Sequence, residues 1–309
     1  MSKKILFFGD VGIDDTVALI YAYLKEELEI VGIVADYGNV PREQTIENVY
    51  YLINQVNPST NIRVIGGAIR PLTGEAPVFY PDIHGKYGLG PINPGNSIGE
   101  IENFFEIANI IETYQNELII VNTGRLTSLA TMFILFAELM KSVKSYYVMG
   151  GAFWVPGNVT AVSEANFHAD PIAVKIVLEF ANNLTIIPLN VTNRAIVTPE
   201  MVDYIHSKGK APIIKPMLDH YYRFYKNRNP SIHGSPVHDA ITLMAVNNDI
   251  FSYQHLPVQI VQTEGVARGQ SIVDIRPYIP FPQNAKIHKI AFDFDYHKFY
   301  IEFMTTLSG

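Results

Sequence analysis

Three aspartates lie within six residues near the start of the chain: Asp10, Asp14 and Asp15. Asp10 follows an apolar run that reads as a β-strand, and the other two open the helix expected after it. One such aspartate is explained as a helix cap, because the N-terminus of a helix has free N–H groups and a positive dipole end. Three exceed what a dipole of roughly half a charge can offset. We therefore expect a metal site, and its oxygen donors favour calcium or magnesium over zinc or copper.

A histidine and an aspartate stand together at a second expected helix start, His238 and Asp239, just before an apolar run. Taken alone, the pair is explained by helix capping. It would also suit a general acid placed beside a metal ligand.

Polar side chains also gather in irregular segments. Asn158, Glu164 and Asn166 share one such segment, and their donors and acceptors match those of a polyhydroxylated sugar. Asn39 follows the second expected strand, where a simple turn is the alternative role. His84 lies in a glycine-rich loop, where it is either a surface residue or a group that could serve a leaving group.

Several functions are excluded or disfavoured. Gly9 and Gly12 lack the spacing of a dinucleotide-binding turn, and the chain has no phosphate-binding loop motif. Without cysteine there are no disulfides or thiolate metal sites, which fits the cytoplasm. A net charge of −7 argues against a nucleic-acid partner. No apolar run reaches the roughly 20 residues that a membrane span needs, so we expect no membrane role.

The pattern of elements predicts how these residues are positioned. Expected strands lie at 4–8, 29–35, 62–66, 118–122, 144–149 and 184–188, and expected helices lie at 14–26, 42–55, 101–115, 126–140 and 170–182. This alternation predicts an α/β fold with an open, doubly wound and mainly parallel sheet. After 198 the pattern is mainly helical to about 247, and strands follow at 257–263, 270–275 and 287–293 before a helix at 295–306. We expect a single domain, 1–309, with a helical insertion, and irregular functional loops at 67–100 and 150–168.

The ordered motifs resemble those of the inosine-uridine-preferring nucleoside hydrolase family, which usually opens with Asp-x-Asp-Pro-Gly-x-Asp-Asp. The matching segments follow in the family's order: 10–15, Tyr37-Gly38-Asn39-Val40, His84-Gly85, Leu126-Thr127, Met149-Gly150-Gly151, Gly157-Asn158, Glu164-x-Asn166, Asp170-Pro171 and His238-Asp239-Ala240. The resemblance runs from about residue 4 to 275. Five positions depart from it: Phe8, Val11, Tyr87, Arg125 and Ser128.

The resemblance implies a calcium-dependent enzyme with a Rossmann-type core that releases ribose and a free purine or pyrimidine base from a nucleoside. Calcium would be held by Asp10, Asp15, the carbonyl of Thr127 and Asp239, and Asp10 would be the general base. Asn39 would help to place the water or the ribose. The ribose would be bound by Asp14, Asn158, Glu164 and Asn166, with Met149 nearby, and the base would face His84 and His238.

Two alternatives stay open, and free ribose as a product would separate both from the hydrolase. One is a non-catalytic nucleoside-binding or ribose-binding protein that keeps the metal site, which the presence of Asp10 and His238 disfavours. The other is a metal-dependent phosphohydrolase, disfavoured because no basic phosphate clamp accompanies the carboxylates. For the hydrolase we expect a cytoplasmic homodimer or homotetramer.

Overall fold

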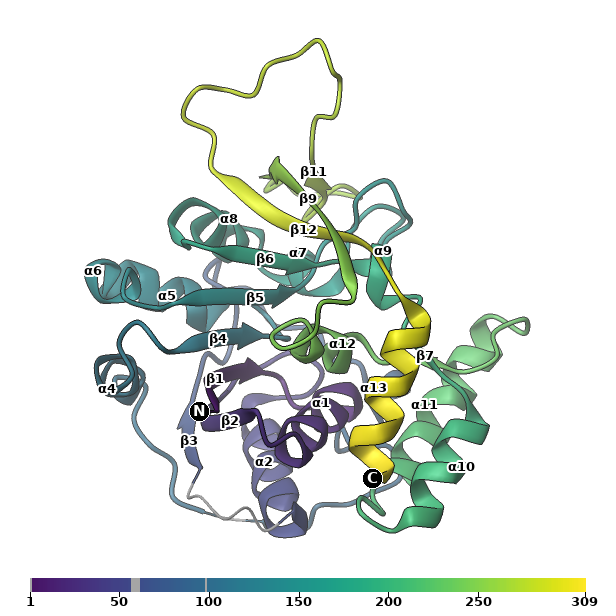
Figure 1. The fold of residues 1–309 in the computed structure, drawn as a ribbon. Helices are drawn as coiled ribbons and strands as arrows, with labels where there is room; N and C mark the ends of the chain where they lie inside the picture. The colour runs from purple at the N-terminus through teal and green to yellow at the C-terminus, as the bar shows by residue number, and fades with distance from the viewer. Residues whose placement is uncertain (1, 57–61, 98) are drawn as a thin grey trace.

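The computed structural model describes residues 2–56, 62–97 and 99–309, and its centre is an eight-stranded sheet (Figure 1). In spatial order the strands are β3 (Arg63–Gly66), β2 (Leu28–Ala35), β1 (Lys3–Gly9), β4 (Ile119–Asn122), β5 (Ser145–Met149), β6 (Leu184–Ile187), β12 (Ile287–Phe294) and β9 (Phe251–Pro257). Neighbours pair in parallel except β12 and β9, which are antiparallel. The predicted α/β fold with a mainly parallel sheet is therefore confirmed.

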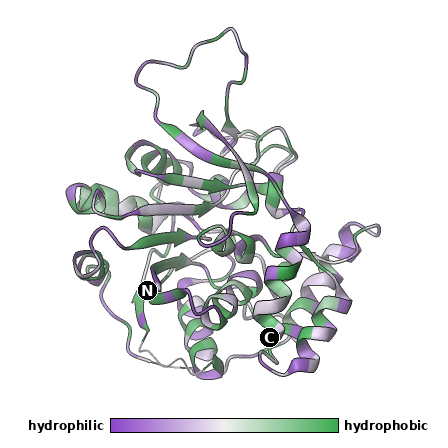
Figure 2. Cartoon of the chain, viewed as in Figure 1, coloured by the Kyte–Doolittle hydropathy of each residue, from purple (hydrophilic) through white to green (hydrophobic). Residues whose placement is uncertain are grey.

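Helices cover both faces of the sheet because its strands are apolar on both sides. In β1, Ile5 and Phe7 belong to one buried core and Leu6 and Phe8 to the other. The first core is closed by α1 (Ile13–Leu24), α2 (Arg42–Val56), α10 (Pro199–Lys208), α11 (Ile214–Arg228), α12 (His238–Met244) and α13 (Tyr296–Ser308). The second is closed by α4 (Glu106–Thr113), α5 (Thr127–Leu135), α6 (Ala137–Met140) and α8 (Pro171–Phe180). Hydrophobic residues accordingly dominate the central strands in Figure 2.

The order of the strands creates a crevice beside β1. The chain runs outward from β1 through β2 to β3, and then returns to place β4 on the other side of β1. Loops that leave the carboxyl ends of β1 and β4 must therefore diverge. Open α/β sheets bind their ligands at this kind of switch point.

The remaining elements are short. Segment 67–100 contains α3 (Pro81–His84), and segment 150–168 leads into α7 (Ala165–Ala169). The others are α9 (Leu189–Thr192), the ribbon of β7 (Ile196–Val197) with β8 (Ser235–Pro236), and the ribbon of β10 (Gln259–Ile260) with β11 (Ser271–Ile272). None of the helices in the described part of the chain is long and apolar enough to cross a membrane.

The structure corrects three element predictions. The strand expected at 257–263 is mostly absent, and the edge strand β9 precedes it. Its sequence is only partly apolar because one side of an edge strand stays exposed, which hid it from a search for apolar runs. The helix expected at 101–115 is shorter, since Glu102 instead bridges to Ile65 of β3. The helix expected at 126–140 is broken at Phe136, whose backbone is not helical.

Candidate active site

A cavity opens at the switch point, beside the carboxyl ends of β1, β4 and β5. Its lining includes ten of the residues proposed from the sequence: Asp10, Asp14, Asn39, His84, Met149, Asn158, Glu164, Asn166, His238 and Asp239. These residues come from segments that are far apart in the sequence, from Asp10 to Asp239. The fold therefore gathers most of the predicted site in one place.

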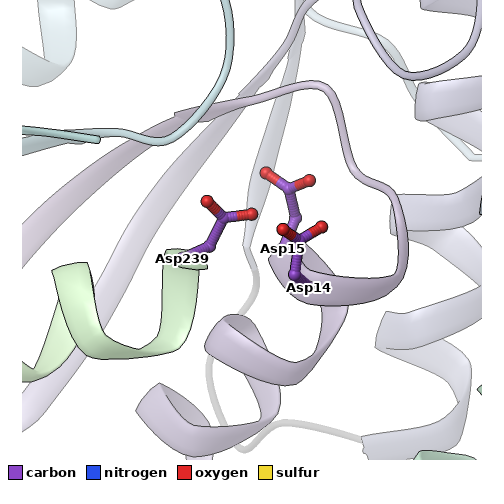
Figure 3. Close-up of side chains that lie close together, drawn as sticks. All are labelled: Asp14, Asp15 and Asp239. Carbon is purple, nitrogen blue, oxygen red and sulfur yellow. The ribbon is translucent and has the colours of Figure 1, made fainter. Parts of the chain in front are cut away.

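Three aspartates form an acidic cluster in this site: Asp14, Asp15 and Asp239 (Figure 3). Asp14 and Asp15 lie in the first turn of α1, Asp239 lies in the first turn of α12, and the carboxylates approach one another between the two helices. One oxygen of each lies within 4.8 Å of the others, and all three side chains are buried. This spacing would let one cation bridge the three carboxylates.

The electrostatics of the cluster also suit a cation. Burial, followed by repulsion from a neighbouring aspartate, raises the pKa of Asp14 and of Asp15 to about 6 and raises that of Asp239 well above its usual value. One oxygen of Asp14, Oδ1, is buried without a hydrogen-bond partner. Buried carboxylates that repel one another are stabilised by a bound cation, and oxygen ligands are those that calcium and magnesium prefer.

Asp10 is close enough to this cluster for its charge to raise the pKa values of Asp14 and Asp239, but its hydrogen-bond partners are different. Its Oδ2 accepts hydrogen bonds from Arg125 Nη1 at 2.8 Å and from the backbone N–H of Asn39 at 2.5 Å. Burial is the largest effect on this carboxyl and raises its pKa to about 7, although the Arg125 guanidinium acts in the opposite direction. A group with this pKa can accept a proton near neutral pH.

Gly38 makes room for the Asp10 carboxylate, which gives a first prediction. A Cβ at Gly38 would lie 1.9 Å from Asp10 Oδ2. Gly38→Ala should therefore displace Asp10, with a loss of turnover of roughly 10²-fold for a shift of about 1 Å and a loss of folding stability of about 1–3 kcal/mol.

Turnover and thermal unfolding of the Gly38 variant should be compared with those of Gly66→Ala. Gly66 is the last residue of β3, the strand that neighbours β2, and a Cβ there meets its nearest neighbour at 3.5 Å. If the two variants kept the same activity, the position of Asp10 would not matter for turnover.

The residues proposed to bind ribose are held firmly by the protein itself. Asn166 Nδ2 donates to the carbonyl oxygens of Thr123 and Met149, and its Oδ1 accepts from Arg125. Glu164 caps α7 and accepts hydrogen bonds from the backbone N–H groups of Gly151, Asn166 and Phe167. Asn158 Oδ1 accepts from the backbone of Ala165. This part of the cavity is thus preorganised.

Two histidines and two tyrosines also line the cavity, next to the acidic cluster. The His238 nitrogens contact the hydroxyls of Thr192 at 2.8 Å and Tyr225 at 3.2 Å. Tyr225 contacts Tyr221, whose hydroxyl donates to Asp14. Burial lowers the pKa of His238 to about 4, so its ring is neutral at pH 7.

His84 differs from His238 in its hydrogen bonding. Its Nδ1 accepts the backbone N–H of Ile13 at 3.3 Å, which assigns the ring proton to Nε2. Burial lowers the pKa of His84 to about 3, so this ring is also neutral at pH 7. His84 would therefore act as a neutral N–H donor through Nε2.

The structure does not bring Thr127 into the cavity lining, although the sequence assigned its carbonyl to the metal. Thr127 begins α5, where its carbonyl accepts the Thr131 hydroxyl and its own hydroxyl donates to Asp170. Thr123, four residues earlier at the end of β4, does line the cavity and donates to Asp15 at 2.7 Å. A polar residue directly after an expected strand was the signal that sequence reasoning missed.

Comparison with known proteins identifies the family of the chain. The family model described as inosine-uridine preferring nucleoside hydrolase matches residues 5–301. The chain is 33% identical over 279 residues to the probable uridine nucleosidase 2 of Arabidopsis thaliana, covering 88% of this chain and 85% of the relative. It is 30% identical over 293 residues to the pyrimidine-specific ribonucleoside hydrolase RihA of Shewanella sp. strain ANA-3, covering 93% and 91%.

A solved structure extends the agreement to three dimensions. The purine-preferring ribonucleoside hydrolase from Gardnerella vaginalis superposes with a TM-score of 0.91 at 28% identity, covering 99% of this chain and 98% of that one. The family match spans nearly the whole chain, and the fold agrees with it. The chain therefore belongs to the inosine-uridine preferring nucleoside hydrolase family and is a hydrolase that acts on N-glycosidic bonds.

Proposed function

We propose that this protein hydrolyses the N-glycosidic bond of ribonucleosides with calcium bound, and releases ribose and a free base. The observation that supports this most is one cavity at the switch point that combines residues of a buried carboxylate cluster with preorganised amides. The relatives are named for uridine, pyrimidine or purine ribonucleosides, so they support the substrate class and leave the preferred base open.

The acidic cluster supports the calcium part of the proposal. Asp14, Asp15 and Asp239 supply oxygen ligands only, which calcium accepts in flexible geometry. Asp10 lines the same cavity beside this cluster and would complete the site. When bound, the cation would orient the water and the sugar hydroxyls and offset the charge of the carboxylates.

Asp10 is the proposed general base. Its pKa of about 7 matches proton abstraction from water near neutral pH. The Arg125 and Asn39 contacts fix Oδ2, so the carboxylate cannot rotate freely. Asn39 contacts both Asp10, through its backbone N–H, and Asp15, through Nδ2 at 3.4 Å. From this position Asn39 would help to place the water.

The histidine and tyrosine side of the cavity is the proposed base-binding part. Cleavage of a glycosidic bond proceeds through an oxocarbenium-like state, and its leaving group needs a proton or a hydrogen bond. His238 is neutral and is held by Thr192 and Tyr225, so we assign it a hydrogen-bonding role toward the departing base. His84 and Tyr225 are the next residues to test there.

This assignment predicts a selective effect of His238→Ala. Loss of assistance to the leaving group should slow inosine cleavage by about 10²–10⁴-fold. A nitrophenyl riboside should be slowed far less, because nitrophenolate departs without a proton. The rates of cleavage of both substrates should be measured for His238→Ala. The same two rates should be measured for His84→Ala and Tyr225→Phe, which test the other candidates. Equal slowing of the two substrates by His238→Ala would instead indicate a role in ribose binding or structure.

The proposed function itself is tested with a panel of purine and pyrimidine ribonucleosides. Release of reducing sugar shows hydrolysis, and the rates across the panel give the preferred base. Nucleoside binding without ribose release would support the alternative of a non-catalytic binding protein. Phosphate release from phosphomonoesters, without ribose release from nucleosides, would support a phosphohydrolase.

We further propose that the protein is a cytoplasmic homodimer or homotetramer. Light scattering of the purified protein would test its oligomeric state, and its location in cells would test the cytoplasmic assignment.

A further inference from the structure

We propose that Arg125 is a specificity-determining residue that donates a hydrogen bond to a hydroxyl of the sugar. The inference rests on the proposed function and concerns one of the positions where the chain departs from the family pattern. Arg125 lies in the loop after β4 and lines the cavity, yet only 3% of its surface is exposed.

The guanidinium of Arg125 is held in a defined orientation. Its Nη1 donates to Asp10 Oδ2 at 2.8 Å and to Asn166 Oδ1 at 2.9 Å. The ring of Tyr80, also in the cavity lining, lies 5.7 Å from the guanidinium carbon. Arg125 therefore connects the residue after β1 with α7, and its planar shape fixes where its other donors point.

These contacts leave donor capacity unused. A guanidinium has five N–H donors, and the two partners of Arg125 both contact Nη1. Its Nε is buried and has no hydrogen-bond partner. An unpaired buried donor is unfavourable, and among the described residues Nη2 has no hydrogen-bond partner either, so an acceptor oxygen of a ligand at the guanidinium would be stabilised.

The charges around Arg125 select the kind of acceptor. Four carboxylates line the same cavity: Asp10, Asp14, Glu164 and Asp239. An anionic phosphate or carboxylate at the guanidinium would stand beside the Asp10 carboxylate, which contacts Nη1 at 2.8 Å, and would be repelled by it, whereas a neutral hydroxyl would not. Both partners of Arg125, Asp10 and Asn166, belong to the proposed water-activating and ribose-binding parts of the site. A sugar hydroxyl is therefore the acceptor that fits.

The test compares kcat and KM for a ribonucleoside and its 2′-deoxy, 3′-deoxy and 5′-deoxy forms, in the wild type and in Arg125→Met. If Arg125 binds one hydroxyl, removal of that hydroxyl from the substrate should lower kcat/KM in both proteins, but the fold-reduction should be at least about tenfold larger in the wild type than in the variant. The other two deoxy forms should lose the same factor in both proteins. Arg125→Lys keeps the charge beside Asp10 but lacks the planar fork, and it serves in the same comparison if the methionine variant does not fold.

The outcomes separate sugar binding from a purely structural role. If Arg125→Met slowed all four substrates by one common factor, Arg125 would only hold Asp10 and Asn166, and the proposal would be overturned. If the wild type released no ribose from any nucleoside, the proposed function would fail instead. Equilibrium binding of the same four nucleosides by calorimetry would then still show whether the Arg125 variants lose selectivity for one hydroxyl.

Discussion

Calcium should raise the melting temperature of the metal-free protein, and by more at pH 8 than at pH 5. The expected sites are Asp14, Asp15 and Asp239, whose pKa values are raised to about 6 for the first two and well above the usual value for the third. At pH 5 protons compete with the cation for these carboxylates, whereas at pH 8 fewer protons remain. Calcium at about 100 times its Kd would stabilise the fold by about 2.7 kcal/mol.

The sign of the pH effect follows from linkage. A carboxyl whose pKa is higher in the folded protein stabilises the fold where it is protonated, and this contribution is lost as the pH rises from about 4 toward 6 or 7. His84 and His238 act oppositely, because their lowered pKa values give stability that is lost as the pH falls below about 6. The histidine contribution is present both with and without calcium, so the difference between the two melting temperatures at one pH isolates the effect of the cation.

Melting curves of chelated protein, with and without added calcium, check this prediction by a readout independent of turnover. Potassium chloride at equal ionic strength is the control for screening, and Asp239→Asn should reduce the calcium shift because it removes one ligand of the cluster. A calcium shift of the same size at pH 5 and pH 8 would show that these carboxylates do not bind the cation.

The sequence predicted the core of the fold because its signals are local. Buried parallel strands such as β1 are continuous apolar runs, and the helices between them have clear periodicity. The edge strand β9 was missed because its pattern, with Ser252 and His255 exposed, resembles that of a loop. The break at Phe136 was missed because the apolar period continues across it.

The candidate site was predicted less evenly. The aspartates were found because three within six residues exceed what a helix start needs, but the sequence could not show that Asp10 contacts Arg125 while Asp14 joins the acidic cluster. That division depends on the direction of each side chain around one turn. Thr123 and Thr127 are both polar residues after β4. Because α5 starts at Thr127, that residue lies against Asp170, whereas Thr123 lines the cavity.

Replacement of Asp10 by asparagine should reduce kcat by about 10²–10⁴-fold, the usual contribution of a general base. An amide oxygen can still accept the hydrogen bonds from Arg125 Nη1 and the backbone of Asn39, but it cannot take a proton from water. The fold should persist, because Glu164 also stabilises the charge of Arg125. Turnover of a ribonucleoside and thermal unfolding should be measured together.

Asp36→Asn is the matched control for Asp10→Asn. Asp36 follows β2 as Asp10 follows β1, is equally buried, and lies outside the cavity lining. Its Oδ1 accepts from the Ser128 hydroxyl and the Ala68 backbone, and burial raises its pKa to about 8. It is therefore largely protonated at pH 7, and an amide should replace it with little effect on turnover.

If Asp36→Asn slowed turnover as much as Asp10→Asn, loss of a buried carboxyl would explain both results. If Asp10→Asn kept near-native turnover, another residue would have to be the base, and the Asp10 contact with Arg125 would then serve only to position the loop after β4.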